Sequence, residues 1–475
     1  MAENEKLERR KPTVGYAVLT LAGVLAIILG GNLLLAAPIQ PMFLIVWLFV
    51  VPMCMKLGYT YKEIENGMME SIKKGMGAVL TIMVVGALIA TWISAGTVPA
   101  IIYYGLKIIN PGIFLLAAFV LCSMVSLACG TSWGTLGTAG IAMFAVGESL
   151  GVPTGMTVGA IVSGAYLGDM MSPMSDSTNV ASAAVGTDLI THCKELAIIG
   201  LPVALVTCVI YYFMGMQFAT DSFDSSYIDE IIAAINMEFN VGFLAFVPVI
   251  LLLALIFLKK PSMLSMLVSA LVAAAIAVFY QGVAATQCLT ILWSGYTADT
   301  GEEFLDTLLN RGGVTSMAAT AFMMIFAFGM IGAFNTVGIM DAIIHPIAQK
   351  TKSILQLTLV SEIIALIGNM MGTNTFSLLM TGSLMSPAYK EKGLHPTNLS
   401  KAINATSTPG CTFIPWNASG MYVVGMYGVG TLGFAPYACY VYLMPLAILL
   451  TVFLKFRVVP ASVNLEAGER YRRAK

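Results

Sequence analysis

Runs of about 20 apolar residues, the length of helix that crosses the hydrocarbon core of a bilayer, recur along the whole chain. Inside hydrocarbon every main-chain polar group must be bonded within the protein, so these runs favour helices. Of the 475 residues, 58% are hydrophobic and only 10% are charged. That is too little charge to cover a water-soluble protein. The sequence therefore predicts an all-α polytopic membrane protein, with the lipid bilayer as its first partner.

The apolar runs fall into two kinds. Uninterrupted runs predict spans at residues 15–37, 39–55, 76–96, 195–216, 240–258, 261–280, 315–337 and 428–454. Four further regions, 112–147, 154–192, 353–389 and 398–427, have Gly, Pro or polar residues in the middle. We expect 112–147 and 353–389 to be re-entrant hairpins, and 154–192 and 398–427 to be broken spans. Amphipathic stretches at 58–74 and 223–236 are predicted to lie at the membrane interface.

The positions of Lys and Arg set the predicted orientation, because cytoplasmic loops are enriched in these residues. With the N-terminus inside, ten crossings and two hairpins place 22 of the 24 basic residues in the cytoplasm. Only Lys107 and Arg311 then lie outside, and both termini are cytoplasmic. The predicted units are a tail at 1–14, a first repeat at 15–216, an external linker at 217–239, a second repeat at 240–456 and a basic tail at 457–475.

The two repeats are related by a constant offset of 242 residues. The matched pairs are Gly96 and Gly338, Gly130 and Gly372, Thr131 and Thr373, Gly140 and Gly382, Gly151 and Gly393, Gly168 and Gly410, Pro173 and Pro415, and Ser177 and Ser419. An odd number of crossings in each repeat turns the second upside down. We therefore predict two inverted five-span repeats, each with a re-entrant hairpin and a broken helix, as in secondary transporters. Chance matching of common membrane residues is the alternative.

The tips of the two predicted hairpins are candidate ion-binding segments. They contain Gly130, Thr131 and Ser132 in the first repeat, and Gly372, Thr373 and Asn374 in the second. A break at membrane depth frees main-chain carbonyl groups beside hydroxyl and amide oxygens, and oxygen ligands suit a hard cation such as sodium. The alternative is that small residues there only allow helices to pack closely.

The first broken span carries two carboxylates, Asp169 and Asp176, on either side of Pro173. The polar residues around them are Ser172, Ser175, Ser177, Thr178 and Asn179, and the second repeat offers Ser407, Thr408 and Asn417. In that repeat Cys411 and Ala418 replace the two acids, so we expect the coupling site in the first repeat. Carboxylates within a membrane are costly to bury and mark ion pathways. The alternative is that they cap helix N-termini.

A carboxyl removed from water favours its neutral form, so it can hold either a proton or a sodium ion. We predict that Asp169 and Asp176 supply this titrating charge, with Glu362 as a further acid that could instead pair with a neighbour. The predicted sodium ligands are Thr131, Ser132, Asp176, Thr178 and Asn179. No cofactor is expected beyond sodium and protons as transported ions, because the eight cysteines form no C-x-x-C motif.

The segment from Leu167 to His192 resembles the NhaC-type sodium/proton antiporter family. The resemblance rests on Gly168-Asp169, Ser172-Pro173, Ser175 to Asn179 and Gly186-Thr187-Asp188-Leu189, and on Ser94 to Pro99, Gly130-Thr131-Ser132 and Gly372-Thr373-Asn374. It extends over residues 15–455. Family members often have Lys directly after the residue that matches Asp169, whereas this chain has Met170.

The resemblance implies the fold of a wider ion-transporter superfamily, in which hairpins and broken helices form a mobile domain beside a scaffold that is often dimeric. It also implies a homodimer in a prokaryotic inner membrane that exchanges sodium for protons. Some relatives resemble malate/lactate antiporters and others amino-acid transporters. A carrier of an organic acid or amino acid, coupled to sodium or protons, is therefore the nearest alternative.

Other functions are weaker fits. A serine hydrolase using Ser132 would need a base within reach, and the histidines (His192, His345 and His395) are predicted near the cytoplasmic boundary. A passive channel would not need buried acids on one repeat alone. The sequence predicts a transporter rather than an enzyme, with no nucleic-acid partner.

Overall fold

The computed structural model describes residues 9–35, 39–108, 110–218, 225–258, 260–298, 312–339, 341–343 and 353–463, with Asp306, Leu309, Asn310 and Leu465. Over these residues the chain is helical, and the sole β-type pairing is one isolated bridge between Leu394 and Pro460. Parts of the predicted tails and linker, at residues 1–8, 219–224 and 466–475, lie outside the described residues.

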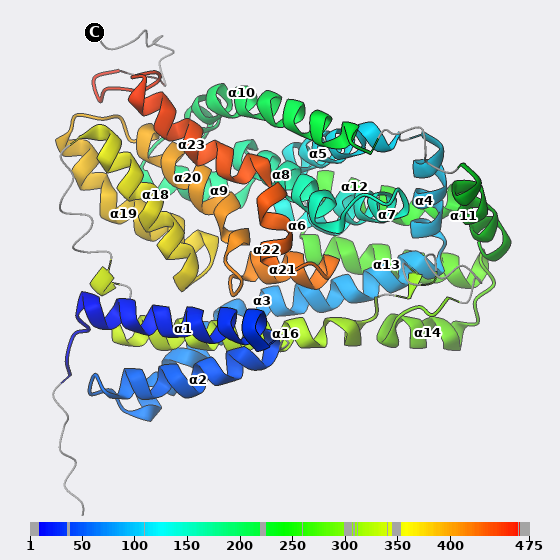
Figure 1. Cartoon of the computed structure of the whole chain (residues 1–475), viewed down its shortest axis with the longest axis horizontal. Helices are drawn as coiled ribbons and strands as arrows, with labels where there is room; N and C mark the ends of the chain where they lie inside the picture. Colours follow the sequence, from blue (N-terminus) through cyan, green and yellow to red (C-terminus); the bar gives the residue numbers. More distant parts are fainter. Residues whose placement is uncertain are drawn as a thin grey trace, which may run out of the picture.

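One group of helices is centred on α3 (Tyr61–Ser94), which contacts α2 (Ile39–Met55), α13 (Ser262–Phe279), α14 (Ala285–Ser294) and α16 (Ala318–Val337). In the same group α1 (Val14–Leu35) packs against α2, and α12 (Val247–Phe257) packs against α13. In Figure 1, α1, α2, α3 and α16 lie together along one side of the molecule. Beyond them, α4 (Thr97–Ile108) and α11 (Ser225–Glu238) lie at one end.

A second group contains the interrupted helices. From the first repeat come α5 (Pro111–Cys129), α6 (Ser132–Thr135), α7 (Ile141–Ser149), α8 (Thr154–Met171), α9 (Asp176–Val185) and α10 (Leu189–Met216). From the second come α18 (Ile354–Met371), α19 (Asn374–Glu391), α20 (Thr397–Gly410), α21 (Ala418–Tyr427), α22 (Thr431–Phe434) and α23 (Cys439–Phe453). The two groups meet where α21 contacts α3 and α16.

Among the described residues, five helices are long and apolar enough to cross a membrane: Tyr61–Ser94, Pro111–Ala128, Leu189–Met216, Val314–Val337 and Ile354–Met371. Two bent helix pairs raise that number to seven, and three shorter helices are also apolar. The chain is thus an all-helical, multi-pass membrane protein, as its composition predicted. The ten crossings and the inversion of the repeats stay predictions.

The structure adds detail to two predicted segments. Most of the stretch 58–74, predicted to lie at the membrane interface, is continuous with the following span in the 34-residue helix α3, and its place relative to the membrane stays a prediction. Thr60 and Glu63 form a capping box that starts this helix, and Gly67 and Gly75 bring it against Thr336 and Phe328 of α16. The predicted span at 428–454 is instead bent by 57° between Thr431–Tyr437 and Cys439–Phe453.

The four predicted interruptions occur where the sequence placed them. The first hairpin region breaks between α5 and α6, and α6 continues through five π-helical residues, Leu136–Gly140, into α7. The broken spans are interrupted between α8 and α9 and between α20 and α21. Helix boundaries also follow the 242-residue offset: α9 matches α21, and residues 132–149 match the bounds of α19.

Helices α5 and α8 cross at very close range, and this contact fixes the position of the first break. A Cβ atom at Gly164 would lie 2.5 Å from the carbonyl oxygen of Phe119, and one at Gly168 would lie 2.3 Å from the main-chain nitrogen of Leu127. Ser126 donates a hydrogen bond to the carbonyl of Ala165 across the same interface. This is the small-xxx-small packing that lets membrane helices approach through their backbones.

We predict that Gly164→Val separates α5 from α8 and lowers the yield of folded, monodisperse protein and its midpoint of thermal unfolding. Overpacking a tight interface costs about 1–3 kcal/mol or more. The matched control is Gly77→Val on α3, where a Cβ atom would meet nothing within 4 Å. Size-exclusion profiles and thermal unfolding in detergent compare the two, and equal stability would contradict the proposed close packing.

Candidate functional site

The four helix interruptions meet around one cavity of about 340 Å³. Its wall includes both hairpin tips, both broken spans and one face of α3. The residues that line it are Ala78, Thr81, Gly130, Thr131, Ser132, Trp133, Tyr166, Asp169, Asp176, Ser177, Thr373, Asn374, Thr375, Cys411, Asn417, Ala418 and Ser419. Many are pairs from the 242-residue repeat, such as Thr131 with Thr373 and Asp169 with Cys411, so both repeats contribute matching positions to one site.

Four helices begin at this cavity. Thr131 and Thr373 cap the helices that start at the hairpin tips, and Ser175 and Asn417 cap α9 and α21. In each case the capping side chain accepts a hydrogen bond from a main-chain N–H group of the first turn. The positive ends of four helix dipoles therefore surround the cavity, which favours negative charge within it.

Asp169 lies near the end of α8 and is the most deeply placed charge of the site, at 8% exposure. Ser132 of the hairpin tip donates a hydrogen bond to its Oδ2 atom at 2.6 Å. On the other side, Ser177 donates to Oδ1 at 3.1 Å and Ser175 donates to the same oxygen. None of the salt bridges among the described residues involves Asp169. Its carboxylate is stabilised by hydrogen bonds from serine hydroxyl groups instead.

Asp176 is the first residue of α9, and it is exposed towards the cavity. The cavity lining contains these two carboxylates and no Lys, Arg or His. A cation entering it would meet two negative charges and a set of hydroxyl and amide oxygens, which are the ligands a hard cation prefers.

The remaining polar residues of the first break bind its main chain. Thr178 donates to the carbonyls of Ser172 and Ser175, at 2.6 and 2.8 Å, and Asn179 donates to the carbonyl of Ser175 at 2.7 Å. Ser172, Pro173, Ser175, Thr178 and Asn179 do not line the cavity. Thr178 and Asn179 thus add side-chain hydrogen bonds to carbonyls of Ser172 and Ser175 that also accept main-chain N–H groups, and so hold the turn between α8 and α9.

A similar network holds the second hairpin tip against the second break. Asn417 donates to the carbonyls of Asn369 and Gly372, at 2.8 and 2.9 Å. Ser407 donates to the side-chain oxygens of Asn369 and Asn374, at 3.0 and 2.8 Å. Ser407 lies behind the cavity lining, as do two other predicted site residues, Thr408 and Gly372.

The two hairpin glycines are not equivalent. Gly130 has a left-handed backbone with φ of +68°, and a Cβ atom there would lie 2.7 Å from the main-chain carbon of Met174. Both features require glycine. Gly372 has an extended backbone, and the atoms nearest to a Cβ atom there would be side-chain atoms of Phe376, at 3.1–3.3 Å. The first hairpin tip is therefore tied directly to the first break through Gly130.

Glu362 lies on α18, apart from the cavity lining, with 4% of its surface exposed. Its Oε1 atom is buried and has no hydrogen-bond partner among the described residues. A buried carboxylate without a partner is costly, whereas the neutral acid is tolerated much better. Glu362 thus belongs to the same group of helices as the cavity but does not join Asp169 and Asp176.

Several lining residues were not among the predicted ligands. The ring of Trp133 stacks on Tyr422 with centroids 4.4 Å apart, and its Nε1 donates to Ser419 at 3.2 Å. Ser419 and Cys411 could have been found as the repeat mates of Ser177 and Asp169. Ala78 and Thr81 could not, because only the packing of α3 against the second group brings them to the site.

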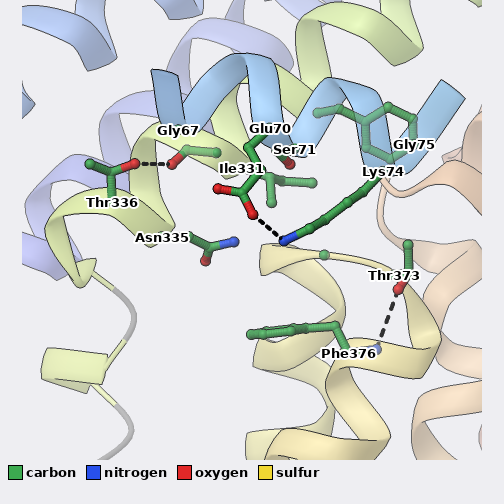
Figure 2. Close-up of a pocket in the computed structure, with 13 residues that line it drawn as sticks. Gly67, Glu70, Ser71, Lys74, Gly75, Ile331, Asn335, Thr336, Thr373 and Phe376 are labelled. Atoms are coloured by element: carbon green, nitrogen blue, oxygen red, sulfur yellow. Dashed lines mark hydrogen bonds and ion pairs between the residues drawn. The ribbon is translucent and has the colours of Figure 1, made fainter. Parts of the chain in front are cut away.

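A second hollow of about 340 Å³ adjoins the tip of the second hairpin. Figure 2 shows Glu70 and Lys74 of α3 on one side, with an ion pair of 2.8 Å between them, and Thr373 and Phe376 on the other. Thr373 also lines the central cavity. The hairpin tip therefore stands between the two hollows.

The histidines have structural contacts. His192 of α10 shares hydrogen bonds with Ser400 through Nδ1 at 2.8 Å and with Asn404 through Nε2 at 3.0 Å. The hydroxyl of Ser132, the nucleophile of the alternative serine hydrolase, donates to Asp169 and not to a histidine. His395 bonds Thr397. His345 lies outside the described residues.

A bundle of membrane helices with paired interruptions around a buried carboxylate defines the class of ion-coupled membrane transporters. The chain belongs to the Na+/H+ antiporter family, whose model matches residues 8–215 and 164–456. This confirms the family suggested by the sequence motifs.

Similar proteins carry different substrates. The chain is 35% identical to the malate-2H(+)/Na(+)-lactate antiporter of Bacillus subtilis, over 90% of this chain and 92% of that protein. It is 29% identical to the Na(+)/H(+) antiporter NhaC of Alkalihalophilus pseudofirmus, over 94% and 96%. It is 28% identical to the arginine/ornithine antiporter ArcD of Halobacterium salinarum, over 94% and 92%.

We predict that Asn417→Leu lowers thermal stability by about 1–3 kcal/mol, because it removes both the donor to the carbonyls of Asn369 and Gly372 and the side-chain cap of α21. Asn398→Leu, which removes a bond to the carbonyl of Val459 far along the chain from the cavity, is the control. It should lose comparable stability but keep protection of the hairpin tip in hydrogen exchange. Unchanged exchange at 372–376 in Asn417→Leu would contradict this role.

Proposed function

We propose that this protein is a secondary active transporter that exchanges sodium ions for protons across a prokaryotic inner membrane. The observation that supports it is the placement of Asp169 at a helix break, buried, bonded to three serine hydroxyls and without a cationic partner among the described residues. Such a carboxyl binds either a proton or a metal cation, so the two ions compete for one site.

In the proposed sodium-bound state, the carboxylate of Asp169 and the oxygens of Ser132 and Ser177 face the ion. The three hydroxyls that donate to Asp169 rotate, so that lone pairs replace O–H groups on the side of the cation. Asp176 and Thr131, both at the cavity surface, add oxygen ligands. When a proton replaces sodium, the neutral acid is stabilised by the same serines.

In the proposed transport cycle the two repeats are inverted relative to each other. When they exchange conformations, the site that opened to one side of the membrane opens to the other. The helices around α3 form the scaffold, and the interrupted helices carry the ions. The hollow beside Glu70 and Lys74 is the proposed access route on the side of the N-terminus. The remaining parts of this proposal are cytoplasmic termini, a homodimer, and no cofactor beyond the transported ions.

We predict that Asp169→Asn abolishes sodium-dependent alkalinisation in proteoliposomes that contain a pH-sensitive dye. If the carboxylate contributes about 1.4 kcal/mol to the free energy of sodium binding, its loss weakens sodium binding tenfold. Asp188→Asn is the control, because Asp188 is the exposed N-cap of α10 and asparagine can also cap. Wild-type exchange by Asp169→Asn would rule out the proposed site.

The competition also has a pH signature. Because protonated Asp169 cannot bind sodium, the sodium concentration for half-maximal exchange should rise as pH falls. One competing proton gives a limiting slope of about tenfold per pH unit. A half-saturation concentration independent of pH would contradict competition at a single carboxyl.

A second candidate function is sodium-coupled exchange of an organic carboxylate. The cavity of about 340 Å³ is much larger than one ion needs and lies within the range of small-molecule sites. Four helix N-termini at its wall would stabilise a carboxylate, with sodium bridging it to Asp169. The similarity to a malate/lactate antiporter supports this candidate.

The two functions are separated by adding malate, lactate, arginine or ornithine to purified protein with sodium or with potassium. A sodium-dependent rise in the unfolding temperature with one of these compounds, lost in Asp169→Asn, would establish the carboxylate or amino-acid carrier. Sodium-driven proton movement without any organic compound would instead support simple exchange.

A further inference from the structure

An apolar groove of about 380 Å³ runs along the outer side of the second helix group, between α10 and α23. Ile198, Pro202 and Val206 form one wall, and Leu443, Ala447 and Leu450 form the other. Figure 1 shows these two helices side by side at the edge of the molecule. Val206 and Leu450 are more than half exposed, at 53% and 54%, so the groove opens away from the protein. It is separate from the central cavity, with which it shares no residue.

One end of this groove carries positive charge. Lys194 is exposed one helical turn before Ile198, and side chains four residues apart lie on the same helix face. On the opposite wall the lining ends at Leu454 and Phe456, with exposed Lys455 between them. The ion pair between Glu195 and Arg457 confirms that these ends of α10 and α23 lie together.

Among the described residues the basic groups at this end outnumber the acids: Lys194, Lys401, Lys455 and Arg457 lie here with Glu195 and with Asp188, which interacts electrostatically with Lys194. Glu195 is shared by two cations, because Lys401 lies 3.4 Å from its Oε2 atom and Arg457 contacts its Oε1 atom. The Nε atom of Arg457 is buried and has no hydrogen-bond partner among the described residues. Lys455 and Arg457 also have left-handed backbones, with φ of 53° and 56°, which is uncommon for residues other than glycine. The turn that they form brings Phe456 back to the groove.

We propose that this groove binds one acyl chain of an anionic phospholipid, whose phosphate group lies between Lys194 and Lys455. The basic residues assign this end of the helices to the cytoplasmic surface, where anionic lipids attract Lys and Arg. An acyl chain starting there runs along the apolar walls towards the bilayer centre. A second copy of this chain is a poorer occupant, because a two-fold interface on this face would bring like charges together.

The site is tested by native mass spectrometry of the full-length protein in mixed micelles with phosphatidylglycerol and phosphatidylcholine of identical acyl chains. Wild type should retain phosphatidylglycerol preferentially. The double variant Lys194→Gln/Lys455→Gln should lose the preference, by about fivefold for each lysine. Ala447→Trp, which fills the groove from the outward-facing wall, should lower retention of both lipids.

The matched control is Lys56→Gln/Lys62→Gln, which removes two exposed basic residues near the start of α3 and keeps the same net charge as the test variant. It should retain the wild-type preference. Equal retention of the two lipids by wild type would overturn the proposal, as would a preference that survives either groove variant. Disulfide crosslinking between two Ala447→Cys copies in the membrane would also overturn it, by showing that the chain itself covers the groove.

Discussion

The structure depends on satisfying main-chain polar groups where helices are interrupted inside an apolar environment. Each interruption leaves N–H and carbonyl groups without helical partners, and hydrocarbon provides no substitute. Thr178 and Asn179 add hydrogen bonds to carbonyls of the first break, and Asn417 bonds carbonyls of the second hairpin tip. These side chains therefore stabilise the irregular main chain that surrounds the cavity.

Shape and charge are distributed differently between the two repeats. Matching residues from both repeats line the cavity, and four capped helices begin there. The acids, however, come from the first repeat alone, since Cys411 and Ala418 stand at the corresponding positions of the second. Both repeats therefore contribute matching positions to the cavity, whereas the negative charge among its lining residues comes from the first repeat alone. Such an arrangement is consistent with the proposed carrier, in which the two repeats exchange conformations around one pair of carboxylates.

The sequence predicted the interruptions well, because Gly, Pro and clustered polar residues are strong local signals in an apolar background. It also proposed that Asp169 and the hairpin tips form one site; the structure brings them to one cavity, and their role in ion binding stays a prediction. Thr178 and Asn179, predicted as sodium ligands, donate hydrogen bonds to main-chain carbonyls and lie outside the cavity lining, and their role likewise stays a prediction. Contacts between segments far apart in the sequence are harder to predict. Ala78 and Thr81 reach the cavity only through the packing of α3 against the second group of helices.

The contact between Gly130 and Met174 limits how the cavity can change its size. Main-chain and Cβ atoms of Met174 lie only 2.7 Å from where a Cβ atom of residue 130 would be, so the first hairpin tip packs directly against the first break. The hydrogen bond from Ser132 to Asp169 joins the same two segments. In the proposed transport cycle, we therefore expect these two segments to move together and the cavity to open or close at the opposite walls, at α3 and the second hairpin tip. The proposed ion ligands Asp169 and Ser132 would then keep their mutual distance while the opening changes.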